Sequence, residues 1–285
     1  MADHVERFAP SPTGPLHLGH AFSAITAYNR AKAANGTFLL RIEDIDITRA
    51  RPEWEAQIYD DLAWLGLDWP TPVLRQSDRF QIYQYHLRTL WDRGLLFACT
   101  CNRRDVKAAA AAPQEGPLPI GPDGIVYPGT CRNKRRSTDF PDAQVYRLDM
   151  RRAVETVDWP LKYFETGSEP DPTWIETTAD DLIQNVGDVV LGRHGTGASY
   201  HLAVTIDDAF QKVTHVTRGE DVQDATQIHV LLQHLFGLPA PTYHHHRLIR
   251  DENGKRLAKR DDARAIRKYR EDGATPEDIR RMVGL

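Results

Sequence analysis

Residues 5–42 read VERFAPSPTGPLHLGHAFSAITAYNRAKAANGTFLLRI, and this order predicts a strand, a loop, a helix and a second strand. Residues 5–9 suit a short strand, and the prolines and glycine that follow exclude regular structure because proline lacks an N–H donor. From Gly19 the apolar residues recur at helical spacing, and Gly36 is suited to end that helix. Residues 38–42 are nearly all apolar, as in a buried parallel strand. The segment is therefore a predicted βαβ unit, with its first loop at the sheet edge where open α/β folds bind ligands.

The composition is that of an ordinary globular protein. The chain has 285 residues, 41% hydrophobic and 27% charged, which is enough for one large domain or two modest ones. No stretch approaches the roughly 20 apolar residues of a membrane helix, and the N-terminus lacks the basic start and apolar run of a secretion signal. Three cysteines, an odd number, argue against a disulfide framework. We therefore expect a cytoplasmic protein without membrane association.

Helical spacing continues beyond the second strand, over residues 52–65 and 78–93. The composition then changes near Cys99. Residues 102–136 contain a run of five alanines, many prolines and glycines, and a basic cluster. We interpret this stretch as an insertion into the sheet domain, with the alanine run as an exposed helix or linker.

The strand and helix pattern returns in the second half of the chain. Strands are expected at residues 200–206 and 212–217, followed by a helix that ends at Gly237. Residues 244–246 are three consecutive histidines. Adjacent residues of a strand point to opposite faces, so we interpret these histidines as a strand end rather than a metal site. The alternation as a whole indicates an α/β fold.

The loop before the first helix carries the first candidate chemistry, His17-Leu18-Gly19-His20. Two histidines three residues apart lie on one side of the first helical turn, where unpaired N–H groups and the helix dipole attract phosphate. Imidazole donors there can stabilise charge that develops on an ATP phosphate, and Gly19 leaves room for the nucleotide. Two surface histidines could also fall near a turn by chance. The strand, loop and helix context favours the nucleotide site.

Four segments, in order, resemble the glutamyl- and glutaminyl-tRNA synthetases of class I. They are RFAPSPTG at residues 7–14 running into HLGH, RIEDID at 41–46, RGED at 218–221, and RLAKR at 256–260, which is similar to the family's KMSKS loop. The resemblance implies a Rossmann-like, doubly wound parallel sheet of the class I aminoacyl-tRNA synthetase type, with a zinc-containing insertion. It also implies that ATP and an amino acid form an aminoacyl-adenylate.

The KMSKS-like loop departs from the family pattern at two positions. Arg256 replaces its first lysine and Ala258 replaces its serine, whereas Lys259 is retained. The resemblance assigns Lys259 to the ATP phosphates, where a mobile ammonium can follow the leaving pyrophosphate. The predicted catalytic residues are therefore His17, His20 and Lys259, and the ATP-binding residues are these three with Gly19.

An amino acid with two carboxylates and one ammonium needs two cationic or donor groups and one carboxylate in its pocket. Arg7 and Arg218 are suitable forks for carboxylates, and Glu43 is suited to the ammonium. Arg7 and Glu43 could instead form a structural ion pair at the strand ends. The resemblance supports glutamate as the substrate, and the predicted glutamate site comprises Arg7, Phe8, Ala9, Pro10, Ser11, Glu43, Tyr200 and Arg218.

The three cysteines fall in one region, Cys99 and Cys101 as C-x-C and Cys131 further on. Three soft ligands in an insertion suggest structural zinc, which takes four ligands in a tetrahedron. From the residues alone, Tyr127, Asp105 or water is available as the fourth ligand, and three ordinary thiols are the alternative. The spacing C-x-C…Y-x-x-x-C resembles the zinc site of short relatives of glutamyl-tRNA synthetase, which implies the ligand set Cys99, Cys101, Tyr127 and Cys131.

Only 25 residues follow Arg260, whereas a complete glutamyl-tRNA synthetase carries a further region that grips the anticodon. We therefore expect no anticodon-binding domain. The expected division is a first half of the catalytic domain, the insertion, a second half, and the KMSKS-like loop with a short helical end, at residues 1–95, 96–185, 186–246 and 247–285. A catalytic domain with so short a C-terminal part resembles the glutamyl-queuosine tRNA(Asp) synthetases, which are short members of the same family.

The resemblance to these synthetases implies that the chain forms glutamyl-adenylate without tRNA, with Mg²⁺ assisting. It also implies that the chain then transfers glutamate to the queuosine base in the anticodon loop of tRNA(Asp). The expected partners are ATP, L-glutamate and that tRNA, with no obligatory protein partner. Residues 132–136 and 247–270, the latter with ten Lys and Arg against four Asp and Glu, are candidate tRNA-backbone contacts. The alternatives are a truncated glutamyl-tRNA synthetase that charges the tRNA 3′ end, a small-molecule nucleotidyltransferase, and an inactive RNA-binding paralogue.

Overall fold

The computed structural model describes residues 4–111, 118–134, 137–142, 145–167, 171–194, 197–250 and 264–285. None of the helices in these ranges combines the length and hydropathy that crossing a bilayer requires.

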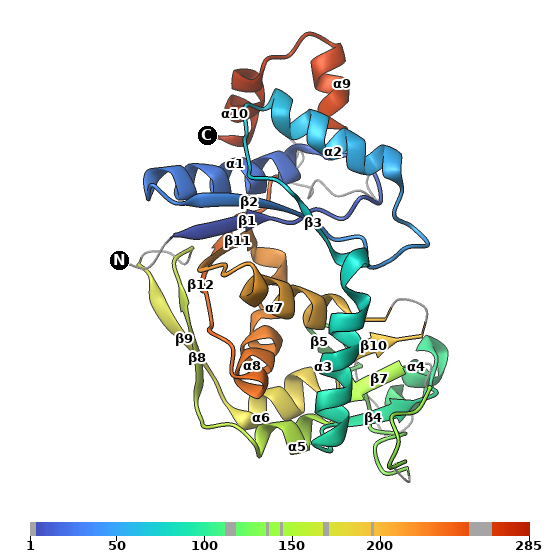
Figure 1. Cartoon of the computed structure of the whole chain (residues 1–285). Coiled ribbons are helices and arrows are strands. Elements are labelled where there is room, and N and C mark those ends of the chain that lie inside the picture. The colour runs from blue at the N-terminus through green and yellow to red at the C-terminus, as the bar shows by residue number, and fades with distance from the viewer. Residues whose placement is uncertain are drawn as a thin grey trace.

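The centre of the molecule is a mostly parallel sheet built from strands of both halves of the chain (Figure 1). Parallel pairing joins β1 (Val5–Phe8) to β2 (Thr37–Ile42), and β2 to β3 (Leu74–Arg75). A second group contains, in spatial order, β11 (His215–Gly219), β12 (Thr242–His246), β8 (Leu161–Glu165) and the antiparallel β9 (Thr173–Thr177).

The two groups of strands meet between β1 and β11. The N–H of Thr214 donates to the carbonyl of Val5 at 3.0 Å, and the N–H of Val5 donates to the Thr214 hydroxyl at 2.8 Å. The order of strands thus reverses at β1, which is the switch point where doubly wound sheets bind their ligands. The predicted Rossmann-like α/β fold is confirmed.

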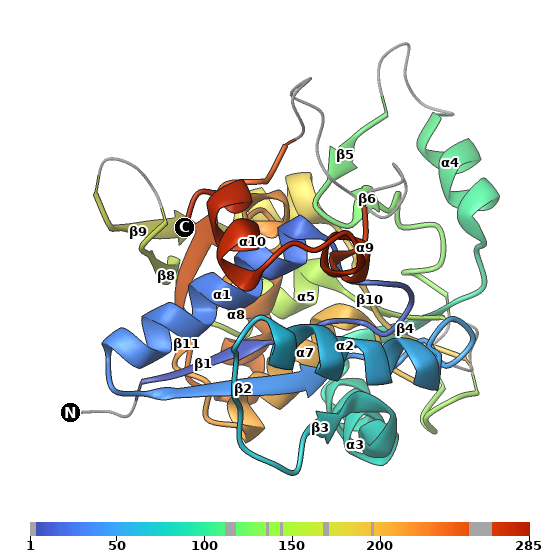
Figure 2. The same ribbon diagram turned by 90° about the horizontal axis from the view of Figure 1, so that it is seen from above.

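Helices cover both faces of this sheet (Figures 1 and 2). On one face lie α1 (Leu18–Ala33), α2 (Pro52–Trp64), α9 (Ile266–Glu271) and α10 (Pro276–Val283), and on the other lie α7 (Tyr200–Phe210) and α8 (Thr226–Phe236). The helices predicted at 52–65 and 78–93 are confirmed, the latter as a short 3-10 turn followed by α3 (Phe80–Asp92). Gly237 ends α8 in the left-handed conformation that glycine favours, also as predicted.

The strand predicted at residues 200–206 is wrong, because these residues form the start of α7. Eight of the eleven residues of α7 are buried, so the helix has almost no polar face. A short apolar run of this kind is ambiguous between a buried helix and a buried strand. Ser199 caps the helix by accepting a hydrogen bond from the N–H of Leu202. The following strand, β11, also begins and ends slightly later than residues 212–217.

The region between the two halves of the sheet forms a smaller antiparallel sheet. Its strands are β4 (Leu96–Cys99), β7 (Val145–Leu148) and β10 (Val190–Arg193), accompanied by α4 (Arg103–Ala111) and the hairpin of β5 (Ile120–Gly121) and β6 (Gly124–Ile125). The short helices α5 (Met150–Val154) and α6 (Ala179–Asp181) lie between the strands in sequence. Strands β8 and β9 also fall within residues 96–185 but pair in the main sheet, whereas β10 of the small sheet lies beyond residue 185.

Candidate active site

The start of α1 holds the two predicted catalytic histidines in one defined arrangement. His17 caps the helix: its Nδ1 accepts a hydrogen bond from the N–H of Gly19 at 3.1 Å. His20 reaches back, and its Nδ1 accepts from the N–H of His17 at 3.2 Å. A backbone N–H can only donate, so in the neutral rings the proton lies on Nε2 of both residues. Both imidazoles therefore offer an N–H donor beside the positive end of the helix dipole, which suits an anionic phosphate.

Lys259, together with Arg256 and Ala258 of the KMSKS-like loop, lies outside the described residues. The chain approaches the HLGH loop again immediately after that segment. The N–H of Ile266 donates to the carbonyl of Leu16 at 2.9 Å, and His17 forms a bridge with Ala265.

Four charged residues form a buried network below the loop that follows β1. Asp208 of α7 accepts hydrogen bonds from Arg7 at 3.1 and 3.4 Å and from Arg41 at 2.7 Å. Arg41 also donates to Glu43 at 3.1 Å. Burial raises the pKa of Glu43. Burial would also raise the pKa of Asp208, but the charges of the two arginines outweigh it and lower that pKa. Two cations and two carboxylates thus balance one another in the interior.

A cavity of about 460 Å³ opens beside this network, where the loop after β1 meets the start of α7. It brings together three residues of the predicted glutamate site, Ser11, Glu43 and Tyr200. The N–H of Glu43 donates to the carbonyl of Pro10 at 3.0 Å, which fixes the acidic residue against the loop. His201 and Asp123 also line the cavity.

The other predicted glutamate residues are not among those that line this cavity. Phe8 and Pro10 are buried, and Ala9 is partly buried. Arg7 is buried and pairs with Asp208 rather than with Glu43, so the structural pair considered from the sequence does not form. Arg218 is buried behind Tyr200, whose hydroxyl accepts a hydrogen bond from Arg218 NH1 at 3.3 Å.

Several polar residues of the site were not found from the sequence. They are Arg41 and Asp208, which hold Arg7 and Glu43, and the imidazoles of His229, which contacts Arg218, and His201, which contacts His229. Arg41 stands within the RIEDID segment quoted above and was visible there. The two histidines sit in apolar helical runs without a spacing that signals a site.

The three cysteines and Tyr127 meet in the small sheet. The Sγ atoms of Cys99, Cys101 and Cys131 all lie within 4.8 Å of one another. The Tyr127 hydroxyl oxygen lies 3.4 Å from Cys99 Sγ and 3.6 Å from Cys101 Sγ. A tetrahedral zinc ion with Zn–S bonds of 2.3 Å separates two sulfurs by about 3.8 Å, and Cys101 and Cys131 lie 3.6 Å apart. The predicted ligand set is therefore gathered at a spacing that fits one metal ion.

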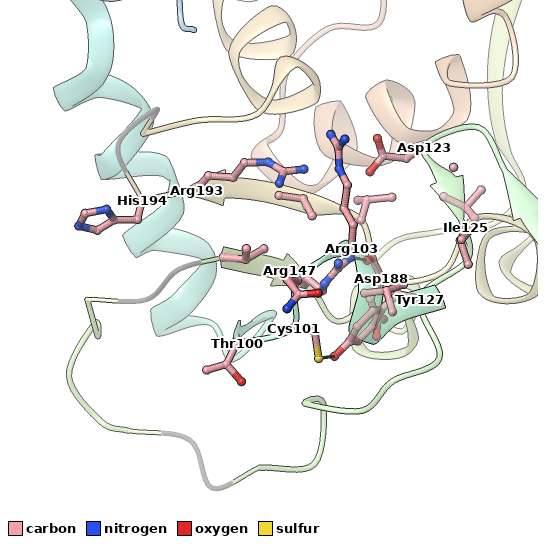
Figure 3. Close-up of a pocket in the computed structure, with 17 residues that line it drawn as sticks. Thr100, Cys101, Arg103, Asp123, Ile125, Tyr127, Arg147, Asp188, Arg193 and His194 are labelled. Atoms are coloured by element: carbon pink, nitrogen blue, oxygen red, sulfur yellow. Dashed lines mark hydrogen bonds between the residues drawn. The ribbon is translucent and has the colours of Figure 1, made fainter. Parts of the chain in front are cut away.

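A larger cavity of about 930 Å³ adjoins the first and extends to this cluster (Figure 3). Asp123, Val190 and Arg193 line both cavities. Figure 3 shows Arg103 and Arg193 extending toward Asp123, above Arg147. Arg147 stacks on the Tyr127 ring, with its guanidinium carbon 3.9 Å from the ring centroid. The second cavity is thus cationic on the side that faces the first.

The predicted basic faces are partly neutralised in the described residues. Arg132 pairs with the buried Asp188 at 2.6 Å, and Arg270 pairs with Asp60 at 2.8 Å. Residues 135 and 136 lie outside the described ranges.

The sequence matches the family described as tRNA synthetases class I (E and Q), catalytic domain, over residues 4–118 and 174–285. The chain belongs to this family.

Particular relatives are more informative than the family as a whole. The chain is 59% identical over 281 residues to the Glutamyl-Q tRNA(Asp) synthetase of Rhodobacter capsulatus, which covers 99% of this chain and 100% of that protein. It is 35% identical over 289 residues to the protein of the same name from Rhodopirellula baltica, covering 99% and 84%. A solved glutamate tRNA ligase from Elizabethkingia meningosepticum, in complex with its amino acid, matches with a TM-score of 0.74 and 28% identity, over 99% of this chain and 60% of that chain.

Proposed function

We propose that the chain is a ligase that activates L-glutamate with ATP and transfers it to the queuosine base in the anticodon loop of tRNA(Asp), without needing tRNA for the first step. The observation that carries the activation step is the cavity in which Glu43 and Tyr200 meet Ser11, on the loop that leads into His17. The 59% identity to the Glutamyl-Q tRNA(Asp) synthetase of Rhodobacter capsulatus supports queuosine in tRNA(Asp) as the acceptor. Its substrates and its reduced thiols suit the cytoplasm.

The first step needs positioning and charge stabilisation rather than covalent catalysis. One carboxylate oxygen of glutamate attacks the α-phosphorus of ATP, and the bond to pyrophosphate breaks. Glu43 accepts a hydrogen bond from Arg41 and lines the cavity, so it is placed to hold the substrate ammonium. His17 and His20 offer Nε2–H donors to the phosphates, and Lys259 is assigned to the leaving pyrophosphate. Mg²⁺ bound with ATP would neutralise phosphate charge.

The second step needs a place for the acceptor next to the adenylate. A hydroxyl of the modified base attacks the mixed anhydride, an ester forms, and AMP leaves. The 930 Å³ cavity adjoins the amino-acid cavity through Asp123 and Arg193, and it is large enough for a nucleoside. Its arginines Arg103, Arg147 and Arg193 suit the phosphates that flank that nucleoside.

The acceptor is tested by transfer assays with three tRNAs. We expect labelled glutamate to be transferred to tRNA(Asp) that carries queuosine, and not to the same tRNA made without the modification. We expect no transfer to the terminal adenosine of tRNA(Glu). Transfer to tRNA(Glu) alone would show a truncated glutamyl-tRNA synthetase instead. Absence of glutamate-dependent exchange of pyrophosphate into ATP would refute activation itself and favour a nucleotidyltransferase or an inactive paralogue.

We further propose that Cys99, Cys101, Tyr127 and Cys131 hold one structural zinc ion. Three thiols and a phenol are a donor set that suits zinc, and the cluster forms a small core with Phe97 and Val106 away from the HLGH loop. Arg147 stacks on the Tyr127 ring, whose hydroxyl faces the cysteines.

Removal of the metal should destabilise the insertion and spare activation. We expect one equivalent of zinc by elemental analysis, a lower Tm after chelation, and unchanged glutamate-dependent pyrophosphate exchange, because the ion supports folding rather than chemistry. Cys131→Ser should lose the metal, and Tyr127→Phe should bind it more weakly. Tyr146→Phe is the matched control, since the hydroxyl of Tyr146 donates to the carbonyl of Pro141 and not to the cluster. Equal zinc affinity in Tyr127→Phe and the control would exclude the tyrosine ligand.

A further inference from the structure

A continuous chain of buried polar groups runs through the protein behind the amino-acid cavity, with Arg218 at its centre. Arg218 Nε donates to His245 Nε2 at 3.0 Å, and Arg218 NH1 donates to His229 Nδ1 at 3.2 Å. Arg218 NH2 donates to the Thr226 hydroxyl at 2.6 Å. All four residues are buried.

The hydrogen-bonded groups around Arg218 extend in two directions, and each direction ends at a carboxylate. On one side His245 Nδ1 bonds to the fully buried Glu165. On the other side His229 Nε2 lies 3.1 Å from His201 Nδ1, and His201 Nε2 lies 3.4 Å from the carboxylate of Asp123. Asp123 lies in the turn between β5 and β6 and lines both cavities (Figure 3).

Arg218 determines which group donates in each hydrogen bond between Glu165 and Asp123. A guanidinium has only donors, so His245 must accept at Nε2 and His229 must accept at Nδ1. Each neutral imidazole then carries its proton on the other nitrogen. His245 donates to Glu165, His229 donates to His201, and His201 donates to Asp123. Burial, and then the charge of Arg218, lowers the pKa of His229 well below its usual value, which is consistent with a neutral ring.

The same constraint fixes the polarity of Tyr200. Because Arg218 NH1 donates to the Tyr200 oxygen, the hydroxyl hydrogen of Tyr200 points away from Arg218. Tyr200 lines the amino-acid cavity, so it presents an O–H donor there. Either oxygen of a carboxylate can accept from this donor, whereas a carboxamide can do so only with its oxygen, in one of its two orientations. The wall therefore favours glutamate over glutamine.

We propose that His229 and His201 are positioning residues that, through Arg218, hold the Tyr200 hydroxyl as a donor and so set the preference for glutamate over glutamine. Neither imidazole needs to touch the substrate for this role. His229 supplies the acceptor that keeps the guanidinium in place, and His201 supplies the acceptor that keeps His229 in the required tautomer. This inference rests on the proposed glutamate activation.

The test measures glutamate- and glutamine-dependent exchange of pyrophosphate into ATP. We expect His229→Leu to raise KM for glutamate by roughly 10- to 100-fold and to reduce the glutamate/glutamine preference in kcat/KM by about 10-fold or more, because the Arg218 donor is left unpaired. KM for ATP should stay within about twofold of the wild-type value. His229→Gln should recover most of the preference, since its amide can accept from Arg218 and donate to His201.

A second variant and a control keep the test independent of folding. His201→Leu, on the cavity wall, should change the preference in the same direction by roughly 3- to 10-fold, and it decides the matter if His229→Leu does not fold. His234→Leu changes an exposed histidine of the same helix and should match the wild type. A folded His229→Leu with wild-type preference would overturn the proposal, as would a His229→Gln variant as impaired as His229→Leu. Absence of glutamate-dependent exchange in the wild type would instead refute the proposed function.

Discussion

Replacement of Asp208 by asparagine is expected to lower the free energy of unfolding by about 3–5 kcal/mol, the usual cost of leaving buried charges without their partner. Asp208 accepts hydrogen bonds from both Arg7 and Arg41, and all three side chains are buried. Asparagine keeps the shape of the side chain and removes its charge. Glu43 then remains as the only carboxylate that Arg41 contacts among the described residues.

Urea unfolding followed by tryptophan fluorescence measures this effect. Asp60→Asn is the matched control, since Asp60 forms an ion pair with Arg270 on the surface, where both side chains are largely exposed. We expect the control to unfold at the same urea concentration as the wild type. If the two variants lost equal stability, Asp208 would not be the anchor of a buried network.

The second large effect is expected in catalysis, at the start of α1. His20→Asn should reduce kcat for glutamate-dependent pyrophosphate exchange by roughly 10²- to 10³-fold, because a preorganised donor to the developing phosphate charge is lost. KM for glutamate should change little, since the amino-acid cavity is lined by other residues. A decrease of less than about threefold in kcat would remove His20 from the catalytic set.

His17 has two roles that substitution can separate. Its Nδ1 caps α1, and its Nε2–H is assigned to ATP. His17→Asn places a good N-cap side chain at this position and removes the imidazole, so it should lose activity with little change in stability. His17→Ala loses the cap as well and should be less stable by a further amount of about 1 kcal/mol. Thermal unfolding together with exchange kinetics distinguishes the two contributions.

The βαβ unit could be predicted from the sequence because local rules determine it. Prolines end the first strand, the apolar residues of α1 recur at helical spacing, and Gly36 follows the helix. The meeting of the three cysteines with Tyr127 could be expected as well, because the spacing C-x-C…Y-x-x-x-C resembles that of short relatives of glutamyl-tRNA synthetase. The helix α7 could not, because burial on almost every side removes the polar face that reveals a helix.

The hydrogen-bond partners of the charged residues could not be predicted from the sequence either. Arg7 looked suited to a substrate carboxylate, yet its guanidinium donates to Asp208, which lies 201 residues away in the sequence. The sequence around His201 and His229 does not indicate a site. A histidine inside an apolar helical run shows the same pattern whether it only packs or also forms hydrogen bonds with other side chains. Long-range pairing of this kind depends on the register of strands and helices, which only the folded chain determines.

The separation between Arg41 and Asp208 has a consequence for synthesis on the ribosome. Their side chains meet across 167 residues of sequence, and Arg7 meets Asp208 across 201. At about 5–20 residues per second, the two arginines leave the ribosome roughly 10–40 s before the carboxylate that neutralises them. Until then, the nascent βαβ unit must keep these cations hydrated rather than buried. The buried network below the loop that follows β1 is therefore completed only after α7 has been made.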